Sequence, residues 1–447
     1  MSSKAYAAIL NHASQFMTLR LCWLAIECEG TLAQTFFDIR FDRNRIELFG
    51  DMRLNYLDQV TSALYQIGVQ ARYPDITLNL RNVTSIMPSM VPPLAAYLRY
   101  LTQQYKIDYT LIQPQNQNVA NRIINLGLAH YIDYRRFEKP GLRSAKPTVM
   151  QFYNLEDCIA VTDKIINNTI RTIKLSRTHI AALEWAVTEI TDNVLNHSQS
   201  PIGGFAIYHH VPRTNIVEFT VADCGVGVAR TLGVKDEREA VELAVQEGVT
   251  RNKATNQGNG LYGTYRLACA SSCIFSLRSR HGTLYVDKEG EVHTRRTNVP
   301  FHGTFVICQI DCNEPDLIKR AFNFGGRPHE PAFDYVEKKH ELDDGAIRIV
   351  ARDICKTFGS RESGREARLY IENILESVDG APVHIDFKDV PVISSSFADE
   401  VFGKLFVAMG SMKFMRLVQL KNLDSTVEGL IGRAIDQRSR TGLGEGG

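Results

Sequence analysis

The sequence predicts a mixed α/β protein built in three parts, and three observations lead to this fold class. The chain has 447 residues, enough for about three domains of ordinary size. Short apolar strands alternate with helical segments in the first and third parts, whereas two long helical patterns precede a run of strands in the middle. The expected parts are residues 1–146, 147–311 and 346–440, with a linker at 312–345 and a disordered tail at 441–447.

The first part has the strand–helix order of a small α/β layer with right-handed crossovers. Its first predicted helix carries Leu94, Leu98 and Leu101 on one side, and Gly127 closes the second. The predicted elements are a strand at 76–80, a helix at 89–105, a strand at 109–112 and a helix at 118–126.

The middle part begins with helical patterns at 155–173 and 176–197. In the second pattern apolar residues recur at three- and four-residue steps, so one continuous face is expected to be buried. These apolar residues are Ile180, Leu183, Val187, Ile190 and Val194, and the strands expected after them are 204–209, 215–222, 273–279 and 303–310.

The third part repeats the first in outline. A linker is expected before it because Pro315, Gly325, Gly326, Pro328 and Pro331 are scattered among charged residues. The predicted elements of the third part are a strand at 383–387, a helix at 397–409, a strand at 417–420 and a helix at 425–437.

Composition excludes several function classes. The formal net charge is +1, from 51 basic and 50 acidic residues, which gives no global electrostatic case for nucleic acid or an anionic membrane. No apolar run approaches the ~18 residues that span a bilayer, and the N-terminus lacks the pattern of a secretion signal, so we expect a cytoplasmic protein. The basic residues Arg278, Arg280, Arg295 and Arg296 are not interleaved with aromatic residues, so nucleic-acid binding is not expected.

The cysteines do not indicate a metal site or a disulfide framework. There are nine, an odd number, and none belongs to a Cys-x-x-Cys pair. The pairs Cys269/Cys273 and Cys308/Cys312 have apolar neighbours, which favours buried, reduced thiols over zinc ligands.

A polar stripe lies on the second long helix of the middle part. Glu189, Asn193 and His197 are four residues apart and therefore share a face. Such a stripe is often only a solvated helix face. A carboxylate can also orient an attacking water, however, and an amide oxygen is a hard ligand suited to Mg²⁺ beside phosphates.

A glycine turn follows the second predicted strand of the middle part. Asp223 ends that strand, and Gly225 and Gly227 lie in the turn. Glycines allow backbone to approach a flat ligand, and the carboxylate can accept a hydrogen bond from an exocyclic amine. An ordinary Asx-type turn is the alternative.

A second glycine cluster precedes a helical stretch at 262–270. The NH groups of Gly258, Gly260 and Gly263, together with a helix N-terminus, can form an anion cradle. The spacing is that of Gly-x-Gly-x-x-Gly, but no strand leads directly into it, so a Rossmann site is not favoured.

In this order the three motifs, together with the late pair Gly303-Thr304, resemble the ATPase domain shared by gyrase, large heat-shock chaperones, histidine kinases and MutL. The spacing Glu-x-x-x-Asn-x-x-x-His is most similar to that of the anti-sigma-factor serine kinases of bacterial partner switching. The resemblance covers about a third of the chain and implies a two-layer α/β sandwich that binds ATP and Mg²⁺.

The resemblance also implies roles for individual residues. Glu189 would activate water or an acceptor hydroxyl, and Asn193 would hold Mg²⁺. Asp223 would read the adenine amine together with Thr304, in a pocket shaped by Gly225 and Gly227. The loop 228–257 would be the ATP lid, in which Arg251 and Lys253 are either phosphate contacts or solvated charges. Around the phosphates we expect Gly258, Gly260, Leu261 and Gly263, with His197 as a further candidate contact.

Both flanking parts resemble STAS domains, the small α/β fold of anti-sigma-factor antagonists. The third part does so through residues 385–387 and 393–400 and is similar to an uncharacterised STAS-like family. Antagonists carry a phosphorylated serine after the strand. Pro88 stands at that place in the first part, so no phosphorylation is expected there. In the third part Ser395 is a candidate phosphate acceptor, or the run Ser394-Ser395-Ser396 merely caps the following helix.

The sequence therefore predicts a bacterial, Mg²⁺-dependent ATP-binding switch protein that hydrolyses ATP slowly and controls a regulatory protein partner, as a homo-oligomer, most simply a dimer. One alternative is a protein serine kinase of the anti-sigma-factor type. Another is a nucleotide-dependent assembly module of a bacterial defence system.

Overall fold

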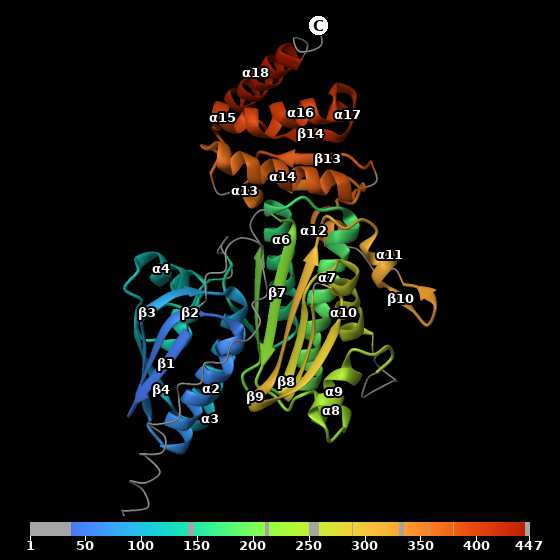
Figure 1. Ribbon diagram of the computed structural model, residues 1–447. Coiled ribbons are helices and arrows are strands. Elements are labelled where there is room, and N and C mark those ends of the chain that lie inside the picture. Colours follow the sequence, from blue (N-terminus) through green and yellow to red (C-terminus); the bar gives the residue numbers. More distant parts are fainter. Residues whose placement is uncertain are drawn as a thin grey trace, which may run out of the picture. The chain divides into compact units, whose positions relative to one another are not determined.

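The computed structural model describes residues 37–442 except 142–146, 211–213, 250–258, 288, 330–334, 356 and 379. These residues form a mixed α/β structure, as predicted, and the first, middle and third parts each contain a sheet of three to five strands (Figure 1). The boundaries that separate the parts as domains stay a prediction. Residues 1–36, which open the predicted first part, lie outside the described residues.

The first part is a four-stranded sheet in the order β1-β2-β3-β4. Its first two strands form an antiparallel hairpin, and the other pairs are parallel. Gly127 ends the helix pattern with φ +85°, the left-handed conformation that glycine adopts readily. The elements are β1 (Phe37–Asp42), β2 (Arg45–Met52), α2 (Leu57–Tyr65), β3 (Asp75–Ile86), α3 (Val91–Tyr105), β4 (Asp108–Ile112), α4 (Gln117–Asn125) and α5 (Leu128–Ile132).

The middle part is an antiparallel five-stranded sheet in the order β5-β6-β7-β9-β8. Two long helices lie along it in Figure 1, α6 (Leu155–Thr172) and α7 (Arg177–Asn193). The predicted loop 228–257 is not a plain loop, because it contains two short helices. The remaining elements are β5 (Met150–Phe152), β6 (Gly204–His210), β7 (Ile216–Asp223), α8 (Val228–Leu232), α9 (Glu237–Ala244), α10 (Gly260–Ala270), β8 (Phe275–Val286) and β9 (Val292–Asp311).

Both faces of this sheet are buried, in two different cores. Side chains alternate along a strand, so neighbours point to opposite faces. On β6, Ala206 and Tyr208 belong to the core that contains α6 and α7, whereas Phe205 and Ile207 belong to the core that contains α2 and α3. The first part is therefore packed on the sheet through a shared apolar core.

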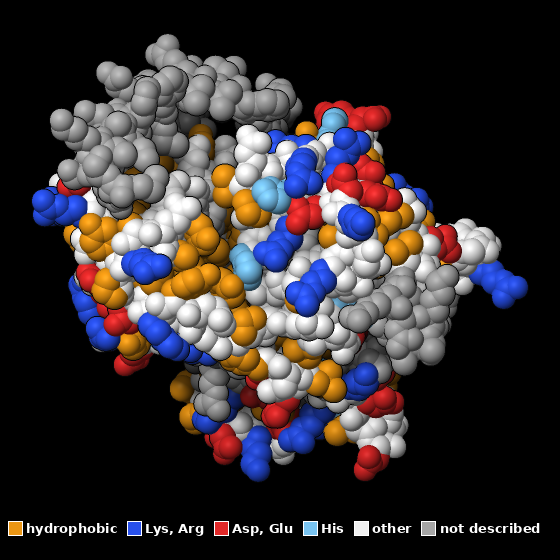
Figure 2. Space-filling model, turned by 90° about the horizontal axis from the view of Figure 1, so that it is seen from below, with side chains coloured by type: hydrophobic (Ala, Val, Ile, Leu, Met, Phe, Trp, Pro, Cys, Tyr) orange, Lys and Arg blue, Asp and Glu red, His pale blue; other side chains and the backbone are white. Residues whose placement is uncertain are grey.

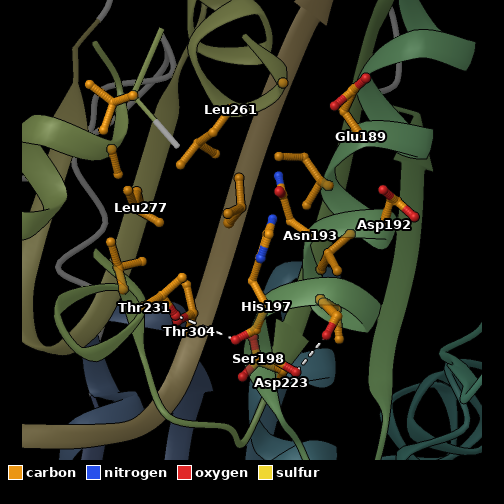
Figure 3. Close-up of a pocket in the computed structure, with 18 of the residues that line it drawn as sticks. Glu189, Asp192, Asn193, His197, Ser198, Asp223, Thr231, Leu261, Leu277 and Thr304 are labelled. Carbon is orange, nitrogen blue, oxygen red and sulfur yellow. Dashed lines mark hydrogen bonds between the residues drawn. The ribbon is translucent and has the colours of Figure 1, made fainter. Parts of the chain in front are cut away.

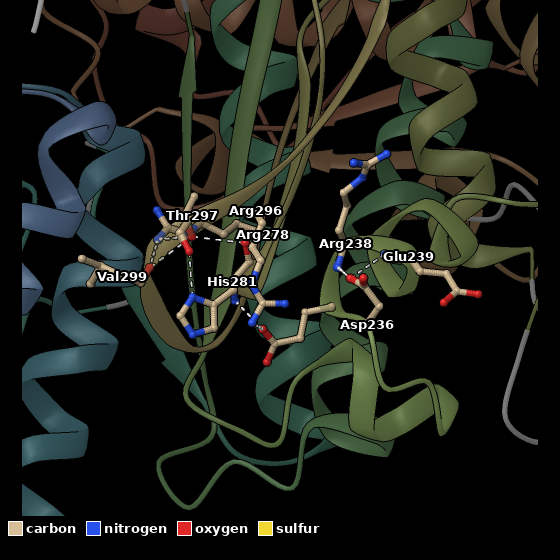
Figure 4. Close-up of polar contacts among 9 residues, drawn as sticks. Asp236, Arg238, Glu239, Arg278, His281, Arg296, Thr297 and Val299 are labelled. Atoms are coloured by element: carbon tan, nitrogen blue, oxygen red, sulfur yellow. Dashed lines mark hydrogen bonds and ion pairs between the residues drawn. The ribbon is translucent and has the colours of Figure 1, made fainter.

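The strands β8 and β9 are longer than predicted and form an extended arm. Arg278 on this arm is buried, pairs with Asp58 of α2 and donates to the carbonyl oxygen of Val299 at 2.8 Å (Figure 4). Arg280 bonds the imidazole of His302 at 2.9 Å. Arg296 pairs with Glu237 of α9 at 4.0 Å, so three of the four basic residues of this stretch are engaged within the fold.

The predicted linker is packed structure. Leu317, Phe322 and Tyr335 are buried in the core of the middle and third parts. The glycines and prolines of this stretch led to the prediction of a linker. Its helices and strands could not be predicted, because each element contains too few residues to show a periodicity. They are α11 (Leu317–Ala321), β10 (Asn323–Phe324), β11 (Arg327–Pro328) and α12 (Tyr335–His340).

The third part is a parallel three-stranded sheet in the order β12-β13-β14. Asn373 ties it to the middle part: its side-chain amide donates to the carbonyl oxygens of Ile170 and Ile173, both at 2.8 Å. The helix predicted at 397–409 is interrupted by a π-helical turn at 399–403. The elements are β12 (Ile347–Val350), α13 (Ala351–Ile354), α14 (Arg361–Ser377), β13 (Val383–Asp386), α15 (Ser395–Ala398), α16 (Lys404–Met409), α17 (Ser411–Leu417), β14 (Val418–Lys421) and α18 (Ser425–Gly442).

Helix α18 continues to Gly442, two residues into the predicted tail, and the rest of the tail lies outside the described residues. None of the described helices combines the length and apolar character needed to cross a membrane. The face drawn in Figure 2 carries basic and acidic side chains interspersed among apolar ones, in keeping with the near-neutral net charge.

Candidate functional site

A cavity of about 400 Å³ lies between α7, the end of β7, the second half of β9, and the helices α8 and α10 (Figure 3). This volume is in the range of small-molecule sites. Eight of the predicted site residues line it together: Glu189, Asn193, His197, Asp223, Gly227, Gly260, Leu261 and Thr304.

Helix α7 brings the polar stripe to the cavity. The helix begins in a capping box between Ser176 and His179 and passes at Val194 into a π-helical turn that ends at Ser198. Such wider turns are rare inside helices and occur often at functional sites. Asn193 and His197 point into the cavity in Figure 3, with Glu189 further along the same helix.

Glu189 is a half-buried carboxylate in contact with the start of α10. Burial raises the pKa of Glu189, and the nearby charge of Asp192 raises it further. A Cβ atom at Gly260 would lie 2.1 Å from Oε2 of Glu189. Glycine at this position therefore lets the helix N-terminus come close to the carboxylate.

Asp223 lies at the other end of the cavity and is only 4% exposed. Its Oδ1 accepts a hydrogen bond from the backbone NH of Gly225 at 2.7 Å. Burial raises the pKa of Asp223 to about 7, against the opposing effect of the backbone NH groups of Gly225 and Thr304. The Asx-type turn is thus present, and it is compatible with ligand binding because a carboxylate has two acceptor oxygens.

The turn after Asp223 is packed against the end of α7. A Cβ atom at Gly225 would lie 2.0 Å from the carbonyl oxygen of Ser198, and the NH of Val226 donates to that same oxygen at 2.7 Å. Gly227 has φ +83° and lines the cavity. Gly225, which was also expected to shape the pocket, does not line the cavity and lies where only a residue without a side chain fits.

Gly263 is placed differently, and three further predicted residues lie outside the described part of the chain. Gly263 does not line the cavity, because it faces the indole of Trp185, where a Cβ atom would lie 2.2 Å from a ring carbon. Its absent side chain permits helix packing. Arg251, Lys253 and Gly258 lie outside the described residues.

Several residues that line the cavity were not predicted, because they lie outside the sequence motifs. Trp185, Thr231 and Asn259 come from elements near the motifs, so the predicted helices could have suggested them. Phe324 and His329 come from the predicted linker, and only the tertiary structure reveals their place in the wall.

The serines of the third part divide their roles. The Oγ of Ser394 accepts from the NH of Phe397 at 3.0 Å, which makes Ser394 the cap of α15. Ser395 is exposed at the first position of that helix. Pro88 in the first part is buried and begins a 3₁₀ turn. Capping therefore accounts for Ser394 and leaves the role of Ser395 open.

The cysteines match the expectation of reduced thiols. The seven that lie in the described part of the chain are free, and all except Cys269 are buried. Burial raises the pKa of the Cys269 thiol as well.

Residues 363–428 match the family model of a STAS-like domain of unknown function (DUF4325). The chain thus contains a STAS-like domain in its third part, over α14, β13, α15, α16, α17, β14 and the start of α18. A search of curated proteins finds no match to the chain.

Proposed function

We propose that the protein is a Mg²⁺-dependent ATP-binding switch that hydrolyses ATP slowly and controls a regulatory protein partner. The observation that carries this proposal is the cavity, in which the buried carboxylate of Asp223 and the polar face of α7 meet. Adenine would lie against the Asp223 turn, and the phosphates would lie along α7 toward the N-terminus of α10.

The donor set fits magnesium held jointly with phosphate. Asn193 supplies an amide oxygen on the cavity wall, and Asp192 beside it accepts from Asn196 at 2.7 Å. Mg²⁺ usually takes one or two protein ligands and completes its octahedron with phosphate oxygens and water. When bound, the ion would neutralise phosphate charge, and Asn193 would orient it.

Glu189 would act on the water that attacks the terminal phosphate. Its raised pKa makes the carboxylate a stronger base than an exposed glutamate. The proximity of Glu189 to Gly260 supports this role, because the phosphates would lie at the N-terminus of α10. The two faces of the five-stranded sheet belong to two apolar cores, one shared with the first part and one with the third part. A change of conformation at the cavity would be transmitted to both flanking parts through these cores.

The test is ATP affinity, measured by calorimetry with and without Mg²⁺. Asp223→Asn should weaken binding roughly 10- to 100-fold, because the single amide oxygen is used by the NH of Gly225 and an NH2 donor would then face the donor amine of the ligand. Glu218→Gln is the matched control. Glu218 is a buried carboxylate on the same strand, but it accepts a hydrogen bond from Gln309 and does not line the cavity. An absence of ATP binding by the wild-type protein contradicts the whole proposal.

The protein serine kinase is the second candidate, favoured by the exposed Ser395 at the start of α15. Transfer of label from γ-labelled ATP separates the two functions. Phosphate release alone supports the ATPase, whereas label on the protein that Ser395→Ala removes supports the kinase.

A pure assembly module predicts a third outcome. Glu189→Ala would then keep partner control and assembly, while Asp223→Ala would lose both. Sedimentation with and without ATP measures the assembly and also tests the expected dimer.

A further inference from the structure

A short hairpin from the predicted linker closes one end of the cavity. The strands β10 and β11 pair antiparallel, and the NH of His329 donates to the carbonyl oxygen of Phe322 at 3.1 Å. The side chains of Phe324 and His329 line the cavity. A segment that follows the five-stranded sheet in the chain therefore completes the wall.

The hairpin lies at the end of the cavity away from Asp223. The contacts along helix α7 show this. At one end of the helix, the carbonyl oxygen of Ser198 holds the turn after Asp223. Near the middle of α7, the ring of Trp185 lies against Phe322 with 4.6 Å between centroids. Trp185 and Ser198 are roughly 20 Å apart at ~1.5 Å per residue. Glu189 is one helical turn from Trp185, so the hairpin lies on the Glu189 side.

Contacts with two neighbouring elements hold the hairpin in place. The ring of Phe324 is 5.9 Å from that of Tyr262 on α10 and 5.3 Å from the imidazole of His329. The NH of Gly325 donates to the carboxylate of Glu247, just beyond α9. The hairpin is thus attached to the elements that bound the Glu189 end.

We propose that His329 binds the terminal phosphate of the nucleotide, so that the β10–β11 hairpin distinguishes a nucleoside triphosphate from a diphosphate. This inference rests on the proposed function, which places the phosphates at the Glu189 end. An imidazole NH is a hydrogen-bond donor in either neutral tautomer and suits a phosphate oxygen. Phe324 packs beside the imidazole and restricts its orientation.

The hairpin precedes the third part in the chain, so a contact between His329 and the terminal phosphate could affect the third part. Helix α12 follows closely after His329, and its residue His340 bonds the Tyr370 hydroxyl at 2.9 Å and the carbonyl oxygen of Arg348 at 3.0 Å. Tyr370 lies on α14 and Arg348 on β12, both in the third part. A hairpin fixed by the terminal phosphate would therefore restrain the segment that joins the cavity to the STAS-like domain.

The experiment compares the dissociation constants of ATP and ADP, each with Mg²⁺, by calorimetry on the full chain. His329→Ala should weaken ATP about tenfold and leave ADP unchanged, because only the terminal phosphate loses a donor. His329→Gln keeps a donor and should recover part of the ATP preference. Asn323→Ala, an exposed position of the same hairpin outside the cavity wall, should behave as wild type.

The outcomes separate the two proposals. If the wild-type protein binds neither nucleotide, the proposed function fails and this inference with it. If it binds ATP, and His329→Ala changes ATP and ADP affinity equally or not at all, the hairpin inference is overturned and the proposed function stands. An equal loss of ATP preference in Asn323→Ala also overturns it, since the effect would then come from hairpin folding.

Discussion

The two ends of the cavity each hold a carboxylate, buried at Asp223 and half-buried at Glu189, but they are built in different ways. At the Asp223 end, backbone surrounds the carboxylate: the turn packs on the carbonyl oxygen of Ser198, and the NH of Gly225 bonds Oδ1. At the Glu189 end, the neighbours are mostly side chains, and they belong to α10 and the β10–β11 hairpin.

This difference indicates a division of labour. Backbone in a close-packed turn cannot move without disturbing β7 and α7, so the Asp223 end is suited to recognition of a constant, flat group. Side chains and a short hairpin rearrange at lower cost, so the Glu189 end is suited to a group that changes during reaction. ATP binding would depend on the Asp223 end. ATP hydrolysis, and the response of the protein to the terminal phosphate, would depend on the Glu189 end.

Removal of the Glu189 carboxylate should have the largest effect. In Glu189→Gln, the rate of ATP hydrolysis is expected to fall about 10²- to 10⁴-fold, because the general base is lost. ATP affinity should stay close to wild type. Steady-state phosphate release and calorimetry measure the two quantities, and a parallel loss of affinity would contradict the division between the ends.

The pH dependence of stability should report on Asp223. Its pKa is about 7 in the folded protein and near 3.8 when unfolded, so between these values the folded state holds a proton that the unfolded state has released. The contribution of Asp223 to the free energy of unfolding of the ligand-free protein should therefore fall as pH rises from about 4 to 7, by roughly 4 kcal/mol, and then level off.

Asp223→Asn lacks this titration, so it should remove that fall and be more stable than wild type at pH 8. Urea unfolding of both proteins across this pH range gives the difference curve. Parallel curves would show that Asp223 is not buried in the way the cavity geometry requires.

Alanine substitutions at Gly225 and Gly260 would compare the rigidity of the two ends of the cavity directly. In Gly225→Ala the new Cβ atom meets backbone at 2.0 Å, so the free energy of unfolding should drop by about 2–3 kcal/mol. In Gly260→Ala it meets the far end of the Glu189 side chain, which can turn away, so the loss should be below ~1 kcal/mol.

Gly429→Ala on helix α18 is the control for these two substitutions. It has open space around the new Cβ atom, and the higher helix propensity of alanine should raise stability by up to about 1 kcal/mol. Urea unfolding measures all three, and an equal loss at Gly225 and Gly260 would remove the contrast in rigidity.

The smallest expected effect concerns magnesium. Asn193→Ala should reduce the gain in ATP affinity on addition of Mg²⁺ by about tenfold or less, because phosphate oxygens and water remain as ligands. Affinity without Mg²⁺ should be unchanged. A loss that is independent of Mg²⁺ would assign Asn193 to the nucleotide itself.

Much of the fold and part of the site could be predicted from local patterns. The spacing of Leu94, Leu98 and Leu101 identified α3, and the apolar stripe that includes Ile190 identified α7. The polar stripe on α7 and the Asp223 turn could be predicted to share a site because the motifs resemble those of a known ATPase family. The arm of β8 and β9 could not, since the first half of β9 is largely exposed and neither strand shows a clean alternation of buried and exposed residues.

The sequence by itself determined the long helices, most strands of the middle sheet and the polar groups that could form a nucleotide site, because periodicity and motif spacing are local properties of the chain. Only the tertiary structure decided that Phe205 and Ile207 face the first part, that Gly225 and Gly263 serve packing, and that His329 joins the cavity wall. These features depend on which distant segments come into contact, and close packing selects among such contacts only when the whole core assembles.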